Sequence, residues 1–131
     1  MKYLLDTGVL IHNLMARSKL NRRALELLAD DSSELYISAA SSWEIAIKAG
    51  TGKLILPERP SQFVIRAIQS MSLQSLDITH NHVAALESLP SFHRDPFDRI
   101  LIAQAKTEEL VLLTADRKLE KYQIETVWCG M

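Results

Sequence analysis

The sequence predicts an α/β fold in which helices cover both faces of a short, mostly parallel sheet. Short apolar runs alternate with helical segments along the chain, a pattern typical of β-α-β units. Residues 110–113 are apolar at every position, as in a strand buried on both faces. The four prolines and four glycines fall between patterned segments, so we expect one domain over residues 1–131.

In the first half of the chain, two residues delimit the clearest helix. Ser38 is a residue type that caps helix starts, and Gly50 tolerates the left-handed turn that often follows a helix end. The expected elements are a strand over 2–6, helices over 9–14 and 24–28, a strand over 35–38 and a helix over 38–49.

In the second half, Asp95 and Pro96 form the sharpest helix start. The acid can cap the helix, and proline suits its first position because the missing N–H would have no partner there. Ser61 and Thr79 predict two further helix starts. The expected elements are a helix over 63–68, a strand over 76–78, helices over 79–86 and 96–108, a strand over 110–113 and a short helix over 116–122.

Composition and charge exclude several classes of protein. With 47% hydrophobic residues in 131, the chain can bury a real core, which excludes disorder. The single cysteine, Cys129, cannot close an intrachain disulfide, which suits a reducing cytoplasm. No apolar run exceeds four residues, too short for a membrane span or a signal peptide. A net charge of -1 argues against bulk attraction to nucleic acid, so only a local basic rim remains possible.

Acidic residues follow two of the predicted strands. Asp6 and Asp116 each come directly after one, and the carboxyl ends of parallel strands meet at the edge of the sheet where sites form. Each acid could instead cap the next helix, and capping is our first interpretation of Asp95.

Helical periodicity places two more acids. On its helix Glu44 lies about 100° from an apolar stripe centred on Trp43, which makes Trp43 a core residue rather than a base-stacking platform. The alternative for Glu44 is a solvated pair with Lys48, worth ~0.3–0.5 kcal/mol. Asp98 shares the core-facing stripe of its helix, where an unpaired carboxylate is costly and needs donors, a cation or a metal. The alternative for Asp98 is a box-like cap together with Asp95.

As a group these acids favour a divalent-metal site. Carboxylates that converge on one pocket repel each other unless cations lie between them, and Mg²⁺ and Mn²⁺ prefer such oxygen ligands. Two ions about 4 Å apart can activate water and clamp a phosphodiester. The group therefore predicts metal-assisted phosphoryl hydrolysis.

Four segments spread along the chain carry its most distinctive pattern. They are Leu4-Leu5-Asp6-Thr7, Ser42-Trp43-Glu44-Ile45, His93-Arg94-Asp95-Pro96-Phe97-Asp98-Arg99 with Ile102-Ala103-Gln104-Ala105, and Leu113-Thr114-Ala115-Asp116-Arg117. In this order and at these spacings they resemble the PIN domain family, in particular the VapC-type toxins of bacterial toxin–antitoxin modules.

The resemblance implies a PIN-like α/β/α sandwich and a cytoplasmic endoribonuclease that uses Mg²⁺ or Mn²⁺ to hydrolyse RNA. It also implies a cognate antitoxin that blocks the site, and a homodimer. Matched position by position, the family's metal-binding acids are Asp6, Glu44, Asp98 and Asp116. The resemblance further implies accessory roles near the site for Asp95, Thr7 and Thr114.

Four basic residues flank the acids and are candidates for contacts with RNA phosphates, although solvated or internally paired roles remain open. They are Arg94, Arg99, Arg117 and Lys118. Two other functions also remain open. One is a phosphoacceptor signalling domain with an acidic Mg²⁺ pocket, although the chain lacks paired acids after its first strand. The other is a PIN-like binding module without catalytic activity.

Overall fold

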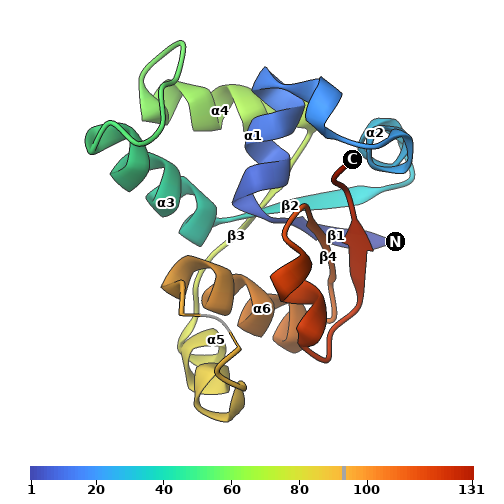
Figure 1. Cartoon of the computed structure of the whole chain (residues 1–131), viewed down its shortest axis with the longest axis vertical. Coiled ribbons are helices and arrows are strands. Elements are labelled where there is room, and N and C mark those ends of the chain that lie inside the picture. Colours follow the sequence, from blue (N-terminus) through green and yellow to red (C-terminus); the bar gives the residue numbers. More distant parts are fainter. Residues whose placement is uncertain (93) are drawn as a thin grey trace.

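The computed structural model describes residues 1–92 and 94–131 of the chain, so His93 of the third segment lies outside the described residues. At its centre is a five-stranded sheet of order β3-β2-β1-β4-β5, in which each neighbouring pair of strands is parallel (Figure 1). The predicted α/β class is therefore confirmed. The strands are β1 (Lys2–Leu5), β2 (Glu34–Ser38), β3 (Gln74–Leu76), β4 (Val111–Thr114) and β5 (Thr126–Trp128).

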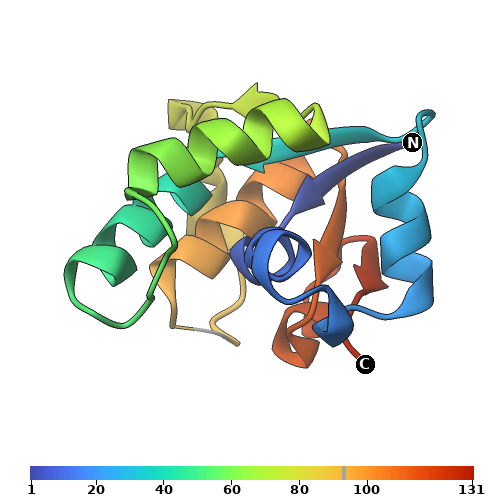
Figure 2. The same ribbon diagram turned by 90° about the horizontal axis from the view of Figure 1, so that it is seen from above.

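Helices cover both faces of this sheet, and Figures 1 and 2 show them as separate layers. On one side lie α1 (Thr7–Met15), α2 (Arg22–Ala29) and α4 (Pro60–Met71), and on the other α5 (His80–Ala85) and α6 (Pro96–Glu108). Helix α3 (Ala39–Gly50) follows β2 at one end of the sheet and contributes to both cores. No described helix has the length and apolar character needed to cross a membrane.

The alternation of side chains along the central strands divides the core in two. Leu5 and Leu113 belong to the cluster under α1, α2 and α4, whereas Leu4 and Leu112 belong to the cluster under α6. Successive residues of a strand point to opposite faces, so a sheet covered on both sides needs apolar residues at consecutive positions. The two faces together explain the continuous apolar runs in the sequence.

Several predicted boundaries differ from the observed ones. Gly50 is the last residue of α3, and Gly52 is the glycine that adopts the left-handed conformation, with φ +76°. Helix α4 begins at Pro60 rather than after a Ser61 cap. The predicted helix over 116–122 is a 3₁₀ helix, η3 (Arg117–Lys121). Strand β5 was not predicted at all.

Asn21 fastens the start of α2 to the end of the chain. Its Oδ1 accepts from the Ala24 N–H at 2.8 Å, and its Nδ2 donates to the carbonyls of Trp128 and Gly130, both at 2.9 Å. We expect Asn21→Ala to lower the free energy of unfolding by about 2 kcal/mol, because it removes a helix cap and two further hydrogen bonds. Asn21→Ser keeps a capping oxygen but cannot reach the two carbonyls, so it should lose about half as much. Urea denaturation measures both variants, and equal losses would contradict the assigned roles.

Candidate functional site

The candidate site begins where β1 and β4 end side by side. Leu5 and Leu113 are paired across these two strands, and the Asp6 N–H still donates to the Leu113 carbonyl at 2.9 Å. The chain then turns into α1 after Asp6, and it leaves β4 through Thr114 and Asp116. The predicted meeting of these two acidic strand ends at one edge is therefore observed.

Asp6 is almost completely buried at this edge, with an exposed fraction of 5%. Its Oδ1 accepts from the Val9 N–H at 2.7 Å, which makes it the N-cap of α1, and its Oδ2 accepts from the Thr114 hydroxyl and the Ala115 N–H. Despite these donors, burial raises the pKa of Asp6 from 3.8 to about 6, and the negative charge of Asp116 contributes to the rise. The carboxylate therefore lies in a setting that a cation would stabilise.

Thr114 links the two acids. Its hydroxyl donates to Asp6, and its oxygen accepts from the Asp116 N–H at 3.0 Å. Asp116 itself is half-buried and caps η3 by accepting from the Lys118 N–H at 2.9 Å. The capping alternatives for Asp6 and Asp116 are therefore both realised, and capping fixes their carboxylates at the sheet edge.

A second pair of hydroxyls joins α1 to α3. Thr7 donates to Ser41 at 3.0 Å, and both side chains are buried. Ser41 stands three residues before Glu44 and therefore lies on the same face of α3. Sequence analysis missed Ser41, although its i, i+3 spacing from Glu44 was a usable signal.

The helical wheel drawn for α3 was wrong. Trp43 is 58% exposed rather than buried, whereas Glu44 is 3% exposed and Ile45 is fully buried. The buried residues of α3 are Ala40, Ser41, Glu44 and Ile45, so the inward face carries a serine and a carboxylate. Hydrophobicity could not identify this face, because polar groups of the site occupy part of it while a tryptophan remains outside.

Glu44 has one paired and one unpaired carboxylate oxygen. Its Oε2 accepts from Lys48 Nζ at 2.5 Å, so the partner is the one named in the alternative, but the pair is not solvated because the Glu44 side chain is 5% exposed. Its Oε1 is buried and has no hydrogen-bond partner in the part of the chain that the structure describes. A buried carboxylate oxygen without a donor is costly, so this atom fits a site that accepts a cation.

Lys48 interacts electrostatically both with Glu44 and with the acids at the start of α6. The hydrogen bond to Glu44 raises the pKa of Lys48, partial burial opposes the rise, and the negative charges of Glu44, Asp95 and Asp98 add to it. Lys48 thus acts as the counter-charge for this group. Sequence analysis considered it only as a solvated partner of Glu44.

Helix α6 supplies Asp95 and Asp98. Asp95 is the predicted N-cap, and its Oδ1 accepts from the backbone N–H groups of Phe97 at 2.9 Å and Asp98 at 3.4 Å. Asp98 is half-buried in the first turn of α6 rather than deep in the core. The fully buried residues of this helix begin at Ile100. The prediction that Asp98 faces the core was therefore only partly right.

The acids thus form two groups joined by the Thr7–Ser41 hydrogen bond. One group consists of Asp6 and Asp116, and the other contains Glu44, Asp95 and Asp98 around Lys48. Among residues 1–92 and 94–131, no three His, Cys, Asp or Glu side chains lie as a ready-made metal cluster. The unpaired Glu44 oxygen and the buried Asp6 carboxylate nevertheless fit a cation ligand set by their chemistry.

The basic candidates divide into two kinds. Arg99 donates to the carbonyls of Pro90 at 2.8 Å and Leu89 at 3.4 Å, so it fastens that loop. Arg117 lies 3.7 Å from the ring centroid of Trp128 and pairs with Glu120 at 3.0 Å. These contacts match the internal roles that we left open as alternatives, and phosphate binding by Arg99 and Arg117 stays a prediction. Arg94 and Lys118 are exposed, and their contacts with phosphate remain a prediction.

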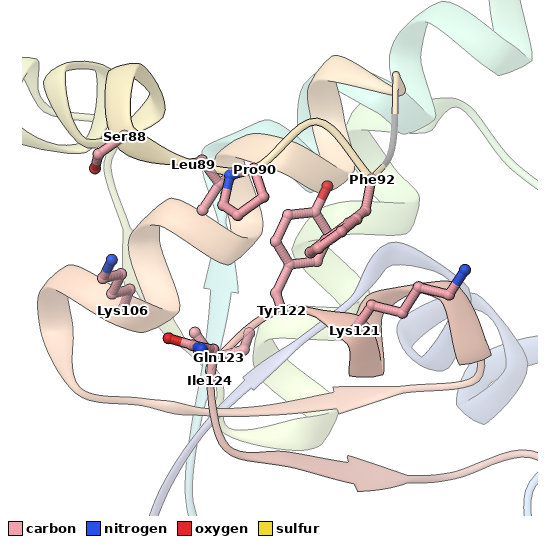
Figure 3. A pocket seen from close by; sticks show the side chains of 9 residues that line it. All are labelled: Ser88, Leu89, Pro90, Phe92, Lys106, Lys121, Tyr122, Gln123 and Ile124. Carbon is pink, nitrogen blue, oxygen red and sulfur yellow. The ribbon is translucent and has the colours of Figure 1, made fainter.

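A cavity of about 230 Å³ lies apart from the acids, and none of the five lines it (Figure 3). Phe92 packs edge-on against Tyr122 there, with ring centroids 5.3 Å apart. Figure 3 shows Lys106 and Lys121 at opposite ends of this cavity. The cavity therefore lies outside the candidate site.

Three solved structures share this fold over nearly the whole chain. The VapBC2 complex of Rickettsia felis bound to promoter DNA has a TM-score of 0.74 at 17% identity, covering 97% of this chain and 98% of that one. DNA-bound VapBC of Salmonella typhimurium has a TM-score of 0.69 at 19% identity, covering 97% of each chain. A toxin–antitoxin complex of Klebsiella pneumoniae has a TM-score of 0.65 at 20% identity, covering 95% of each chain.

The sequence itself identifies the family. No curated protein matches the chain significantly. The family model of the PIN domain matches residues 3–125, a segment that includes all five acids. Together with the parallel sheet and its helical layers, this match shows that the chain belongs to the PIN domain family.

Proposed function

We propose that this protein is an endoribonuclease of the VapC type, the toxin of a toxin–antitoxin pair, and that it depends on Mg²⁺ or Mn²⁺. The observation that carries the proposal is the buried Glu44 oxygen without a partner, on the helix that Thr7 and Ser41 fasten beside Asp6. Membership of a family of nucleases supports hydrolysis of a nucleic acid.

The residues proposed to hold the metal are Asp6, Glu44, Asp98 and Asp116. A divalent cation held there would neutralise charge on the phosphodiester and would lower the pKa of a water molecule. The chain positions the ligands: Thr114 orients Asp6 through its hydroxyl and Asp116 through its backbone. Arg94 and Lys118 would hold RNA phosphates beside the acids, and Asp95 fixes the first turn that carries Asp98.

The proposal includes two protein partners. The similar structures are complexes named VapBC or described as toxin and antitoxin. We propose that this chain also has a cognate antitoxin, and that the antitoxin blocks the acidic edge. We further propose that the protein forms a homodimer and acts in the cytoplasm.

RNA cleavage tests this function. We expect the purified protein to cut single-stranded RNA when Mg²⁺ or Mn²⁺ is present and to stop when the metal is chelated. Asp98→Asn should lower the rate by about 100-fold, because removing one ligand charge removes about 2.7 kcal/mol of transition-state stabilisation. Gel analysis of labelled RNA measures the rate.

Three outcomes would contradict the proposal. Equal rates for wild type and Asp98→Asn would remove Asp98 from the site. Metal binding without RNA cleavage would favour a silent binding module. Stable labelling by a small phosphodonor would favour a phosphoacceptor domain.

A further inference from the structure

We propose that the exposed Trp43 and the half-buried Phe97 beside it, with the adjoining groove between α3 and α6, bind a nucleobase and phosphate of the RNA strand. This inference rests on the proposed ribonuclease function and assigns it a substrate-binding subsite. The chemistry required of the ligand is a flat π-face next to a negative charge.

The aromatic part of the subsite is Trp43. It remains 58% exposed, although tryptophan is one of the most hydrophobic side chains. Its ring meets Phe97 edge-on, with centroids 4.9 Å apart and planes at 83°. One turn further along α3, Ile47 is also 41% exposed. Adjoining apolar side chains in solvent mark a binding surface more often than isolated ones do.

The charged part of the subsite is the groove next to this pair. It encloses about 420 Å³, and its charged lining consists of three cations, Lys48, Lys53 and Arg94, and one carboxylate, Asp95, so positive charge is in excess. Lys53 and Arg94 are exposed, and cations at the edge of an apolar groove suit a phosphate. Positive charge beside an apolar surface therefore favours a nucleic acid strand as the ligand over an apolar peptide that carries no acidic residues.

Position along the helices connects this groove to the acids. Trp43 directly precedes Glu44 on α3, and Phe97 directly precedes Asp98 on α6. Neighbouring residues of a helix point about 100° apart, so each aromatic lies beside an acid and faces a different direction. A base stacked here would place the adjoining phosphates toward the acidic edge, and stacking of this kind tolerates any base.

Binding of an uncleavable strand tests the subsite independently of cleavage. The probe is a labelled single-stranded 2′-O-methyl oligonucleotide of about 12 nucleotides, and fluorescence anisotropy measures its Kd. We expect Trp43→Ala to raise the Kd roughly 5- to 150-fold, the range for losing one stacked base. Trp43→Phe should raise it only about threefold, because a π-face remains. Lys53→Ala should lower the dependence of log Kd on log salt by about one unit.

Phe92→Ala is the matched control, because Phe92 is 53% exposed yet lies at the separate cavity. It should leave the Kd unchanged. Thermal melting checks that each variant is folded.

Unchanged binding by Trp43→Ala, or an equal effect of Phe92→Ala, would overturn the subsite. The subsite would also be overturned if Trp43→Ala converted a dimer into a monomer in size-exclusion chromatography and left the Kd unchanged. Trp43 and Phe97 would then form a contact between subunits. Lack of binding by the wild type would also overturn the subsite. None of these results contradicts the proposed ribonuclease function. That function is contradicted if the wild-type protein does not cut RNA.

Discussion

Replacing Lys48 with methionine is expected to weaken the metal-free fold while tightening its binding of Mn²⁺. The side chain of Glu44 is 5% exposed, and Lys48 Nζ, 2.5 Å away, is its cationic partner. Removing one partner of a buried ion pair costs about 3–5 kcal/mol. Because the Lys48 side chain is 43% exposed, solvent screening should reduce the loss to about 2 kcal/mol.

The same substitution should favour the metal. Lys48 occupies one oxygen of Glu44 and adds positive charge beside Asp95 and Asp98. A divalent cation must displace this ammonium or bind against its repulsion. We therefore expect Lys48→Met to lower the Kd for Mn²⁺ by about tenfold, a coupling of about 1.4 kcal/mol.

Urea denaturation with chelator measures the stability of the metal-free protein, and isothermal calorimetry measures Mn²⁺ binding. Arg22→Met is the matched control, because Arg22 and Glu26 form the same i,i+4 pair at 3.1 Å with side chains 93% and 67% exposed. This control should change neither quantity measurably. Weaker Mn²⁺ binding by Lys48→Met would show that Glu44 does not receive the metal.

The features that sequence predicted well depend on local chemistry. Asp95 and Pro96 begin α6 at the predicted residue because a capping oxygen and a missing N–H act within one turn of helix. Thr79 likewise caps α5 as expected. The adjacency of Asp6 and Asp116 followed from a general property of parallel sheets rather than from any contact seen in advance.

The features that sequence missed depend on tertiary partners. Strand β5 has only three residues, and it exists because β4 supplies its hydrogen-bonding partner. The wheel for α3 failed because the helix turns Glu44 inward and leaves Trp43 in solvent. Hydrophobic periodicity assumes that burial follows apolarity, and that assumption fails where a helix carries the polar groups of a site.

The accessory hydroxyls show the same limit. The resemblance indicated Thr7 and Thr114, but the hydroxyl partner of Thr7 is Ser41, 34 positions away. The spacing of Ser41 from Glu44 could have placed it on the site's face of α3, but its contact with Thr7 leaves no periodic signal. That contact appears only when α1 and α3 are packed together.

Asp6→Asn is expected to stabilise the metal-free protein at neutral pH and to abolish most RNA cleavage. Burial raises the pKa of Asp6 from 3.8 to about 6, so the folded protein binds the proton more tightly than the unfolded chain. The stabilising effect of protonated Asp6 is therefore complete below about pH 4 and is lost as the pH rises through about 6. At pH 7 the free energy of unfolding of the wild type is therefore lower by about 3 kcal/mol than it would be with Asp6 protonated.

Asparagine carries no charge and avoids that loss. It gives up one acceptor for the Ala115 N–H or the Thr114 hydroxyl, at a cost of about 1 kcal/mol. Asp6→Asn should therefore be more stable than wild type by about 2 kcal/mol at pH 7, and below pH 4, where only the lost hydrogen bond remains, it should be less stable by about 1 kcal/mol. Cleavage with Mn²⁺ should fall by about 100- to 1000-fold, because the most buried proposed ligand loses its charge.

Urea denaturation at both pH values, with chelator, measures the stability difference, and cleavage of labelled RNA measures activity. Asp30→Asn serves as the control, because the pKa of Asp30 is lowered by its hydrogen bonds to Ser32 and it lies outside the site. It should leave cleavage unchanged and give no stabilisation at pH 7. If Asp6→Asn alone gains stability and loses cleavage, the buried charge destabilises the fold and is kept because the reaction needs it. If Asp6→Asn is less stable than wild type at pH 7, the carboxylate serves only as a structural cap.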